Sequence, residues 1–159
     1  MGEIIIKKYD PWPPYSSLTG SHAELVLLGH EHAADLAVAA NDDALHELWY
    51  TSVPHPDDML DEINRRLDLR RHGIMLPYAV IETKTGKAVG MTTFMNIDAP
   101  HRRLEIGSTW LRKSVQRSAI NTECKMMLLT YAFEELDCIA VEFRTHVLNH
   151  QSRAAIERL

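Results

Sequence analysis

Polar and basic residues lead directly into a predicted amphipathic helix, an arrangement that can bind phosphate. Residues 114–128 read SVQRSAINTECKMML, and we expect the helix to open at Asn121, a good N-cap residue. Free N–H groups and the positive end of the dipole attract anions to a helix N-terminus. Such loops usually contain glycine so that the backbone can approach the ligand, and this one has none. An ordinary capped helix start without a ligand is therefore the alternative.

Charged side chains near this stretch offer two further functions. Arg112, Lys113 and Arg117 flank the loop and could neutralise phosphate charge, although a solvated basic turn is the other interpretation. Glu105 lies on the polar face of the preceding predicted strand, where a carboxylate could remove a proton from an ammonium group. The alternative for Glu105 is a structural ion pair with Arg144 on a neighbouring strand.

The nine histidines and two cysteines do not form a metal-binding pattern. His30 and His32 are two residues apart, so they point to different sides of a helix, and the HExxH motif is absent. Cys124 and Cys138 have no CxxC spacing and are typical of reduced core residues, which indicates a cytosolic compartment. We predict no metal and a cytoplasmic protein.

Composition limits the classes of partner. The 159 residues fit one domain, and 45% apolar and 25% charged residues are ordinary for a globular protein. A net charge of −5 argues against a general nucleic-acid binder. No apolar run approaches the length of a membrane span, and the N-terminus lacks a signal-peptide pattern. We expect neither a nucleic-acid nor a membrane partner.

The candidate residues depend on an alternation of helices and strands. We predict an N-terminal extension over residues 1–18, with a strand near 3–9, and one α/β or α+β domain over residues 19–159. The predicted elements are a strand at 21–28, helices at 29–49 (broken near 41–43) and 56–73, two strands within 76–98, a strand at 102–111, a helix at 121–136, a strand at 138–148 and a helix from 149.

Two predictions concern side-chain placement within these elements. The strand at 102–111 alternates, so we expect Leu104, Ile106 and Trp110 on one face and Glu105, Gly107 and Thr109 on the other. The helix at 56–73 carries acids early and four arginines late, which suits the helix dipole. We expect those arginines, Arg65, Arg66, Arg70 and Arg71, to form a solvated helix end.

Several stretches, in a fixed order, resemble the GNAT superfamily of acyl-CoA-dependent N-acetyltransferases and, within it, the RimJ/RimL-type branch. They read LTGSHAELVLL, AVGMTTF, LEIGSTWL, QRSAINTECKMMLLTYAFEEL and VEFRTHVLNHQSRAAIERL. The resemblance implies a mixed, mostly antiparallel central sheet with helices on both faces. It also implies two parallel strands that splay apart, here at 105–111 and 140–146.

The resemblance implies that acetyl-CoA lies between the splayed strands, with its pyrophosphate on the helix that follows. Ala119 stands at the central glycine of the family's loop motif, and Ile156 stands where many relatives carry a proton-donating tyrosine. Glu105 and Ser152 are then the catalytic candidates, as base and as substitute acid, and the alternative to Ser152 is a thiolate that leaves unaided. The implied acetyl-CoA contacts are Thr109, Trp110, Leu111, Arg112, Gln116, Arg117, Ser118, Ala119, Ile120, Asn121, Thr122, Asn149 and Ser152.

The implied reaction is acetyl transfer from acetyl-CoA to a primary amine of a protein N-terminus or a small molecule. The amine would attack the thioester directly in a ternary complex, with the backbone of residues 108–111 polarising the carbonyl. A non-catalytic acyl-CoA-binding or regulatory module is the alternative. The family's last two strands have no counterpart after residue 159. We therefore expect either a fragment of a longer protein or a shortened protein that borrows this edge from a partner, as in a homodimer with strand exchange.

Overall fold

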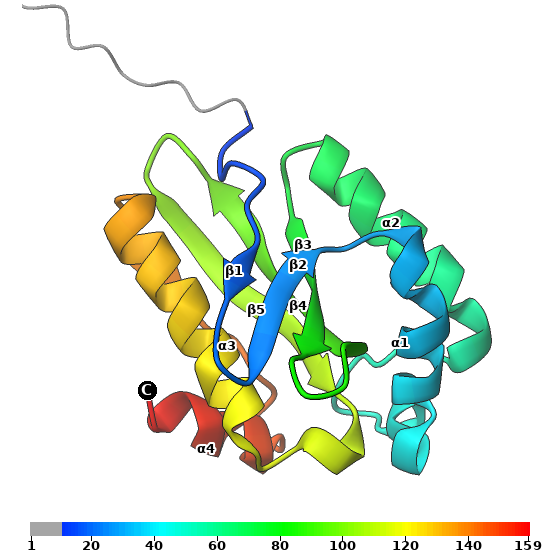
Figure 1. Ribbon diagram of the computed structural model, residues 1–159. Helices are drawn as coiled ribbons and strands as arrows, with labels where there is room; N and C mark the ends of the chain where they lie inside the picture. The colour runs from blue at the N-terminus through cyan, green and yellow to red at the C-terminus, as the bar shows by residue number, and fades with distance from the viewer. Residues whose placement is uncertain (1–10) are drawn as a thin grey trace, which may run out of the picture.

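The computed structural model describes residues 11–159 (Figure 1). The predicted strand at residues 3–9 lies outside these residues. Leu18, at the end of the predicted extension, lies in the first strand, and the side chain of Trp12 packs against the core. The strands of the described part are β1 Leu18–Thr19, β2 Ala23–Leu27, β3 Leu76–Glu82, β4 Lys87–Asp98, β5 Arg103–Leu111 and β6 Ala140–Glu142.

The helices agree with the predicted regions but differ in their ends. The predicted helix at 29–49 is α1, Ala33–Ala40, between two 3-10 segments, and its expected break is confirmed by positive φ angles at Asp43 and Ala44. The third helix continues as a π-helical turn, Tyr131–Glu135. The α-helices after α1 are α2 Met59–Arg71, α3 Ala119–Thr130 and α4 His150–Glu157.

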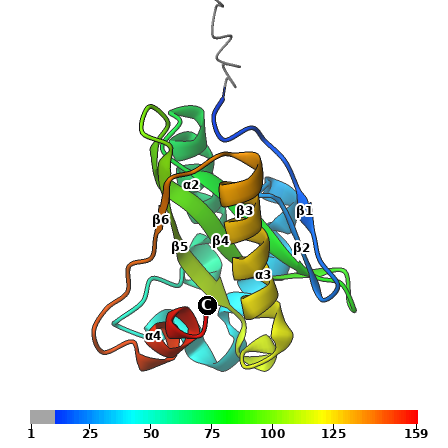
Figure 2. The same cartoon turned by 90° about the vertical axis from the view of Figure 1, so that its left-hand side faces the viewer.

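The strands form one sheet in the order β1-β2-β3-β4-β5-β6 within the described part of the chain. All neighbouring pairs are antiparallel except β5 and β6, which run parallel. Their pairing is limited to Arg103–Glu105 against Ala140–Glu142, and the chain beyond β6 then leaves β5 toward α4 (Figure 2). The parallel, splayed pair is confirmed, but the strand predicted at 138–148 is much shorter, because only its first residues find a partner.

Helices cover both faces of the sheet, as predicted (Figure 1). On one face α3 packs through Ile120, Cys124 and Leu128 against β-strand residues that include Phe94. On the other face α1 and α2 pack through residues such as Leu36 and Ile63. The sheet is therefore buried on both sides, and a polar site is confined to its ends and edges.

A β-bulge in β5 changes which face the later side chains occupy. Met91 of β4 pairs with Trp110 and Thr93 pairs with Gly107, so two residues of β5 stand opposite one of β4. Ser108, inside the bulge, has a φ angle of 47°. The bulge reverses the alternation: Leu104 and Ile106 face α3, whereas Trp110 packs with α1 and α2. The prediction that Leu104, Ile106 and Trp110 share one face was therefore wrong.

Candidate functional site

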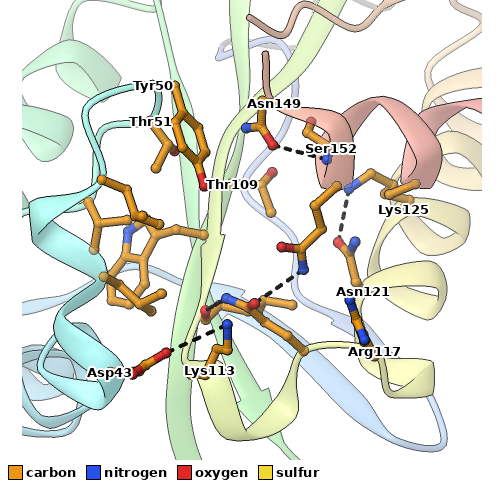
Figure 3. A pocket seen from close by; sticks show the side chains of 18 residues that line it. Asp43, Tyr50, Thr51, Thr109, Lys113, Arg117, Asn121, Lys125, Asn149 and Ser152 are labelled. Atoms are coloured by element: carbon orange, nitrogen blue, oxygen red, sulfur yellow. Dashed lines mark hydrogen bonds and ion pairs between the residues drawn. The ribbon is translucent and has the colours of Figure 1, made fainter.

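A pocket of ≈ 210 Å³ opens where β5 and β6 diverge (Figure 3). One wall is formed by α3 and the start of α4, and the other by the segment that follows α1. The end of β5 and the loop after it lie between these walls. The lining residues are Asp43, Leu45, Leu48, Tyr50, Thr51, Val53, Thr109, Trp110, Leu111, Lys113, Gln116, Arg117, Asn121, Lys125, Asn149, Gln151, Ser152 and Ala155.

The helix beside the pocket begins earlier than predicted. Ser118 is the N-cap of α3, because its backbone is extended and its Oγ accepts a hydrogen bond from the N–H of Ile120 at 3.3 Å. Asn121 therefore lies inside the first turn of α3 and does not cap it. Its side chain is free to face the pocket, which it lines.

One residue of the loop before α3 has a left-handed backbone, and it is not Ala119, the residue at the family's glycine position. Ala119 is the first residue of α3 and its conformation makes no demand for glycine. The positive φ angle falls on Arg117, at 61°. An alanine at position 119, where the family carries glycine, is therefore compatible with the backbone of this loop.

A buried lysine lies in the same wall. The Lys125 ammonium donates a hydrogen bond to Oδ1 of Asn121 at 2.9 Å, and the lysine side chain is buried. Desolvation lowers the pKa of Lys125 below its ordinary value. Within residues 11–159 Lys125 forms no ion pair with a carboxylate, so its positive charge is available to an occupant of the pocket.

The flanking basic residues differ in their partners. Arg112 pairs with Asp42 at 3.2 Å and does not line the pocket, and Lys113 approaches Asp43 at 3.6 Å at the pocket rim. Arg117 lines the pocket and forms no ion pair with another described residue. Arg117 and Lys125 are thus the pocket cations that no carboxylate neutralises in the described chain.

Hydrogen bonds join α4 to the loop and to β5. Asn149, where the last predicted helix begins, caps α4, and its Oδ1 accepts the N–H of Ser152 at 3.1 Å. Gln151 donates to Oε1 of Gln116 at 3.1 Å, and Gln116 in turn donates to the carbonyl of Leu111 at 2.9 Å. This chain of contacts joins α4, the loop before α3 and the end of β5.

Glu105 lies outside the pocket lining, four residues before Thr109 on β5 and on the other side of the bulge at Ser108. Its side chain is 6% exposed. Oε2 accepts a hydrogen bond from Asn96 at 2.6 Å and lies 3.5 Å from Nε of Arg144. The ion pair that the sequence left open as an alternative is therefore present in the structure.

The remaining predicted contacts divide between two places. Ser118 and Thr122 line a second hollow between α3 and α4, which shares Arg117 and Asn121 with the pocket. Ile120 is buried in the core, and Ala119 lines neither hollow. The predicted residues that the structure gathers in the pocket are Thr109, Trp110, Leu111, Gln116, Arg117, Asn121, Asn149 and Ser152.

The family model described as the acetyltransferase (GNAT) domain matches residues 23–159, which is most of the chain. The chain belongs to the GNAT acetyltransferase family. Among curated proteins, this GNAT chain is 39% identical over 74 residues to YdaF of Bacillus subtilis, which is named for ribosomal N-acetyltransferase activity. That match spans 46% of the chain and 40% of YdaF, so it covers well under two thirds of the relative.

Solved structures share this GNAT fold. A GCN5-related N-acetyltransferase from Brucella melitensis is 25% identical and superposes with a TM-score of 0.82. The aligned region covers 93% of this chain and 68% of the Brucella chain. RimJ of Mycobacterium smegmatis, solved with CoA-disulfide, is 20% identical and superposes with a TM-score of 0.76. The aligned region covers 92% of this chain and 75% of the RimJ chain. The second likeness establishes the fold alone.

Several pocket residues of this GNAT chain were not predicted from its sequence. Asp43, Tyr50 and Thr51 come from the segment that follows α1. That segment is far in sequence from β5, α3 and α4, and contacts between such distant segments leave no local sequence pattern. Lys125 could have been found, because it lies one helical turn after Asn121 and therefore on the same face of α3. Gln151 adjoins the predicted Ser152 but carries no recognisable cap pattern of its own.

The structure also bears on the predictions about metal ligands, cysteines and membrane spans. Among residues 11–159 no group of three or more His, Cys, Asp or Glu side chains is placed to hold a metal ion. Cys124 and Cys138 are buried free thiols, and burial raises their pKa values to about 12 and about 11. No helix of the described residues has both the length and the apolar character needed to cross a membrane.

Proposed function

We propose that the pocket binds acetyl-CoA and that the protein transfers the acetyl group to a primary amine. The proposal rests on three features that lie together where β5 and β6 diverge. These are the first turn of α3, the unneutralised cations Arg117 and Lys125, and the end of β5. A ligand with a polyanionic end and a narrow, extended arm matches these features.

Each part of acetyl-CoA has a counterpart in the proposal. The pyrophosphate lies at residues 117–121, where helix N–H groups and the Arg117 guanidinium attract negative charge. The pantetheine arm follows Thr109 and Leu111 of β5 toward Asn149. The amide of Asn149 uses only part of its hydrogen-bonding capacity in capping α4, so its N–H groups remain for the arm.

The chemistry needs no covalent enzyme intermediate. A neutral amine attacks the thioester carbonyl carbon, a C–N bond forms, the C–S bond breaks, and the thiolate of CoA takes up a proton. We assign that proton donation to the Ser152 hydroxyl, because Ser152 lines the pocket and Ile156 cannot donate. Ser152 regains a proton, through water, from the ammonium nitrogen that the attack creates. The same proposal needs no metal and places the reaction in the cytoplasm.

We assign Glu105 to structure rather than to proton removal. Its carboxylate is held by Asn96 and Arg144 and lies outside the pocket lining. The amine proton then passes to water in the pocket.

A protein N-terminus is the first acceptor to test. This choice rests on the name of YdaF, to which part of the chain is 39% identical. The competing function is a non-catalytic acyl-CoA-binding module, and it is favoured by Ile156 at the position of the family's tyrosine.

The test is calorimetry with acetyl-CoA, followed by a screen of N-terminal peptides and small primary amines. We expect stoichiometric binding and release of free CoA with at least one amine. Ser152→Ala should bind acetyl-CoA as the wild type does and turn over more slowly. No binding would overturn the proposal, and binding without turnover on any amine would favour the non-catalytic module.

A further inference from the structure

An arginine outside the pocket contacts the backbone that leads into it. Arg66 of α2 was expected at a solvated helix end, but its side chain is only 2% exposed. Its Nε donates to Oε1 of Glu62, one turn earlier on α2, at 2.6 Å. A guanidinium with five N–H groups has more donors than this single ion pair uses.

The other end of the guanidinium reaches across to β5. Nη1 and Nη2 of Arg66 lie 3.4 and 3.3 Å from the carbonyl oxygen of Ser108, which is 42 residues away in sequence. Ser108 is the bulge residue with a φ angle of 47°. A left-handed conformation costs a serine roughly 1–2 kcal/mol, so the surrounding contacts must hold it in place. Two charge-assisted hydrogen bonds onto its carbonyl are suited to that task.

Fixing this carbonyl also fixes the N–H group of the next residue. The carbonyl of Ser108 and the N–H of Thr109 belong to one planar peptide unit. The cis peptide bond found in the described chain is at Pro13, so this unit is trans and its two groups point in opposite directions. With the carbonyl directed at α2, the Thr109 N–H is directed away from α2. Thr109 itself lines the pocket, and its hydroxyl is held by that of Thr92 at 2.8 Å.

We propose that Arg66 is a positioning residue, which holds the Ser108 carbonyl so that the Thr109 N–H is aimed at the thioester carbonyl of bound acetyl-CoA. This inference rests on the proposed function of the pocket. A donor that is already aimed stabilises the negative charge that develops on the carbonyl oxygen during amine attack, without reorganising at that moment. The ion pair with Glu62 keeps the guanidinium oriented.

Arginine is suited to this position for a geometric reason. Its planar fork can contact the Glu62 carboxylate along one edge and the Ser108 carbonyl along another. The compact ammonium of a lysine keeps the charge beside Glu62 but cannot span both partners in a fixed direction. Arg65 supplies a matched comparison, because it also binds Glu62, at 2.7 and 2.9 Å, but is half-exposed and makes no contact with Ser108.

The experiment compares Arg66→Lys with Arg65→Lys. Acetyl-CoA labelled with ¹³C at the thioester carbonyl is bound to each protein, and the carbonyl stretch is recorded by infrared difference spectroscopy. We expect the wild type and Arg65→Lys to shift the stretch to lower wavenumber, and Arg66→Lys to lose most of that shift. Acetyl-CoA affinity should stay within about twofold in all three, because the arginines lie outside the pocket. With an acceptor amine, kcat of Arg66→Lys should fall at least tenfold, since loss of one such donor costs about 10²–10³-fold.

A second variant protects the experiment against misfolding of Arg66→Lys. The double change of Glu62 and Arg66 to methionine removes the buried guanidinium together with its part-buried carboxylate partner, and removing both charges of a pair is often tolerated. It too should lose the carbonyl shift. Normal acetyl-CoA binding with an unchanged carbonyl shift in a folded Arg66 variant would overturn the positioning role and leave the proposed function standing. Failure of the wild type to bind acetyl-CoA would overturn both.

Discussion

The ammonium nitrogen of Lys125 lies 2.9 Å from Oδ1 of Asn121, one turn earlier on α3, in the wall of the pocket. Burial lowers the pKa of this amine below its ordinary value of 10.5. The folded protein therefore binds fewer protons here than the unfolded chain. Its contribution to stability rises with pH between the lowered pKa and 10.5.

An anionic ligand should reverse this shift, because negative charge favours the protonated amine. We therefore expect acetyl-CoA to bind with proton uptake between the lowered pKa of Lys125 and 10.5, measured above the range in which histidines and phosphates titrate. Calorimetry in two buffers with different ionisation enthalpies measures this uptake. Lys125→Met should abolish it, and Lys84→Met, in the exposed turn between β3 and β4, should retain it. Equal uptake in both variants would place the ligand away from Lys125.

Arg117 combines a left-handed backbone with an unneutralised charge, and two substitutions separate these properties. Arg117→Gly suits the φ angle of 61° and removes only the charge, so we expect a loss of acetyl-CoA affinity of several-fold. Arg117→Glu reverses the charge and should weaken binding by more than tenfold, about 1.4 kcal/mol. Both losses should shrink at high salt in calorimetric titrations. Unchanged affinity in Arg117→Glu would remove the pyrophosphate from this loop.

Ala119 stands where the family's loop motif carries glycine, and a substitution tests whether glycine would improve the loop. Since Ala119 is the first residue of α3, a glycine gains no conformational advantage there. We expect Ala119→Gly to leave acetyl-CoA affinity unchanged and to lower the free energy of unfolding by roughly 0.5 kcal/mol. Chemical denaturation and calorimetry measure the two quantities. A clear gain in affinity would mean that the bound loop needs a left-handed residue at position 119.

Glu105 and Arg144 should behave as an ion pair in stability measurements. Glu105→Gln and Arg144→Met should each cost no more than about 1 kcal/mol, because Arg144 is 68% exposed and solvent screens the pair. That cost lowers Tm by about 2–4 °C in a protein of this size. Acetyl-CoA affinity should not change, and the acidic limb of the pH–rate profile should persist in Glu105→Gln. Loss of that limb would make Glu105 the general base after all.

Local sequence patterns were sufficient for much of this protein. Three features depend on residues within a few positions of one another. They are the start of α4 at Asn149, the interruption of the predicted helix near residues 41–43 and the pairing of the successive strands β3 and β4. The order of helices and strands follows from the same short-range periodicities. The resemblance of these ordered stretches to a known family then pointed to the pocket between β5 and α4.

Tertiary structure alone decided the finer geometry of the site. The bulge at Ser108 depends on pairing with β4, and it turned Trp110 to the face opposite its predicted one. Arg66 is buried because α2 lies against the sheet and brings it to a carbonyl 42 residues away. Neither result has a local sequence pattern, because each is set by contacts between segments that only folding brings together.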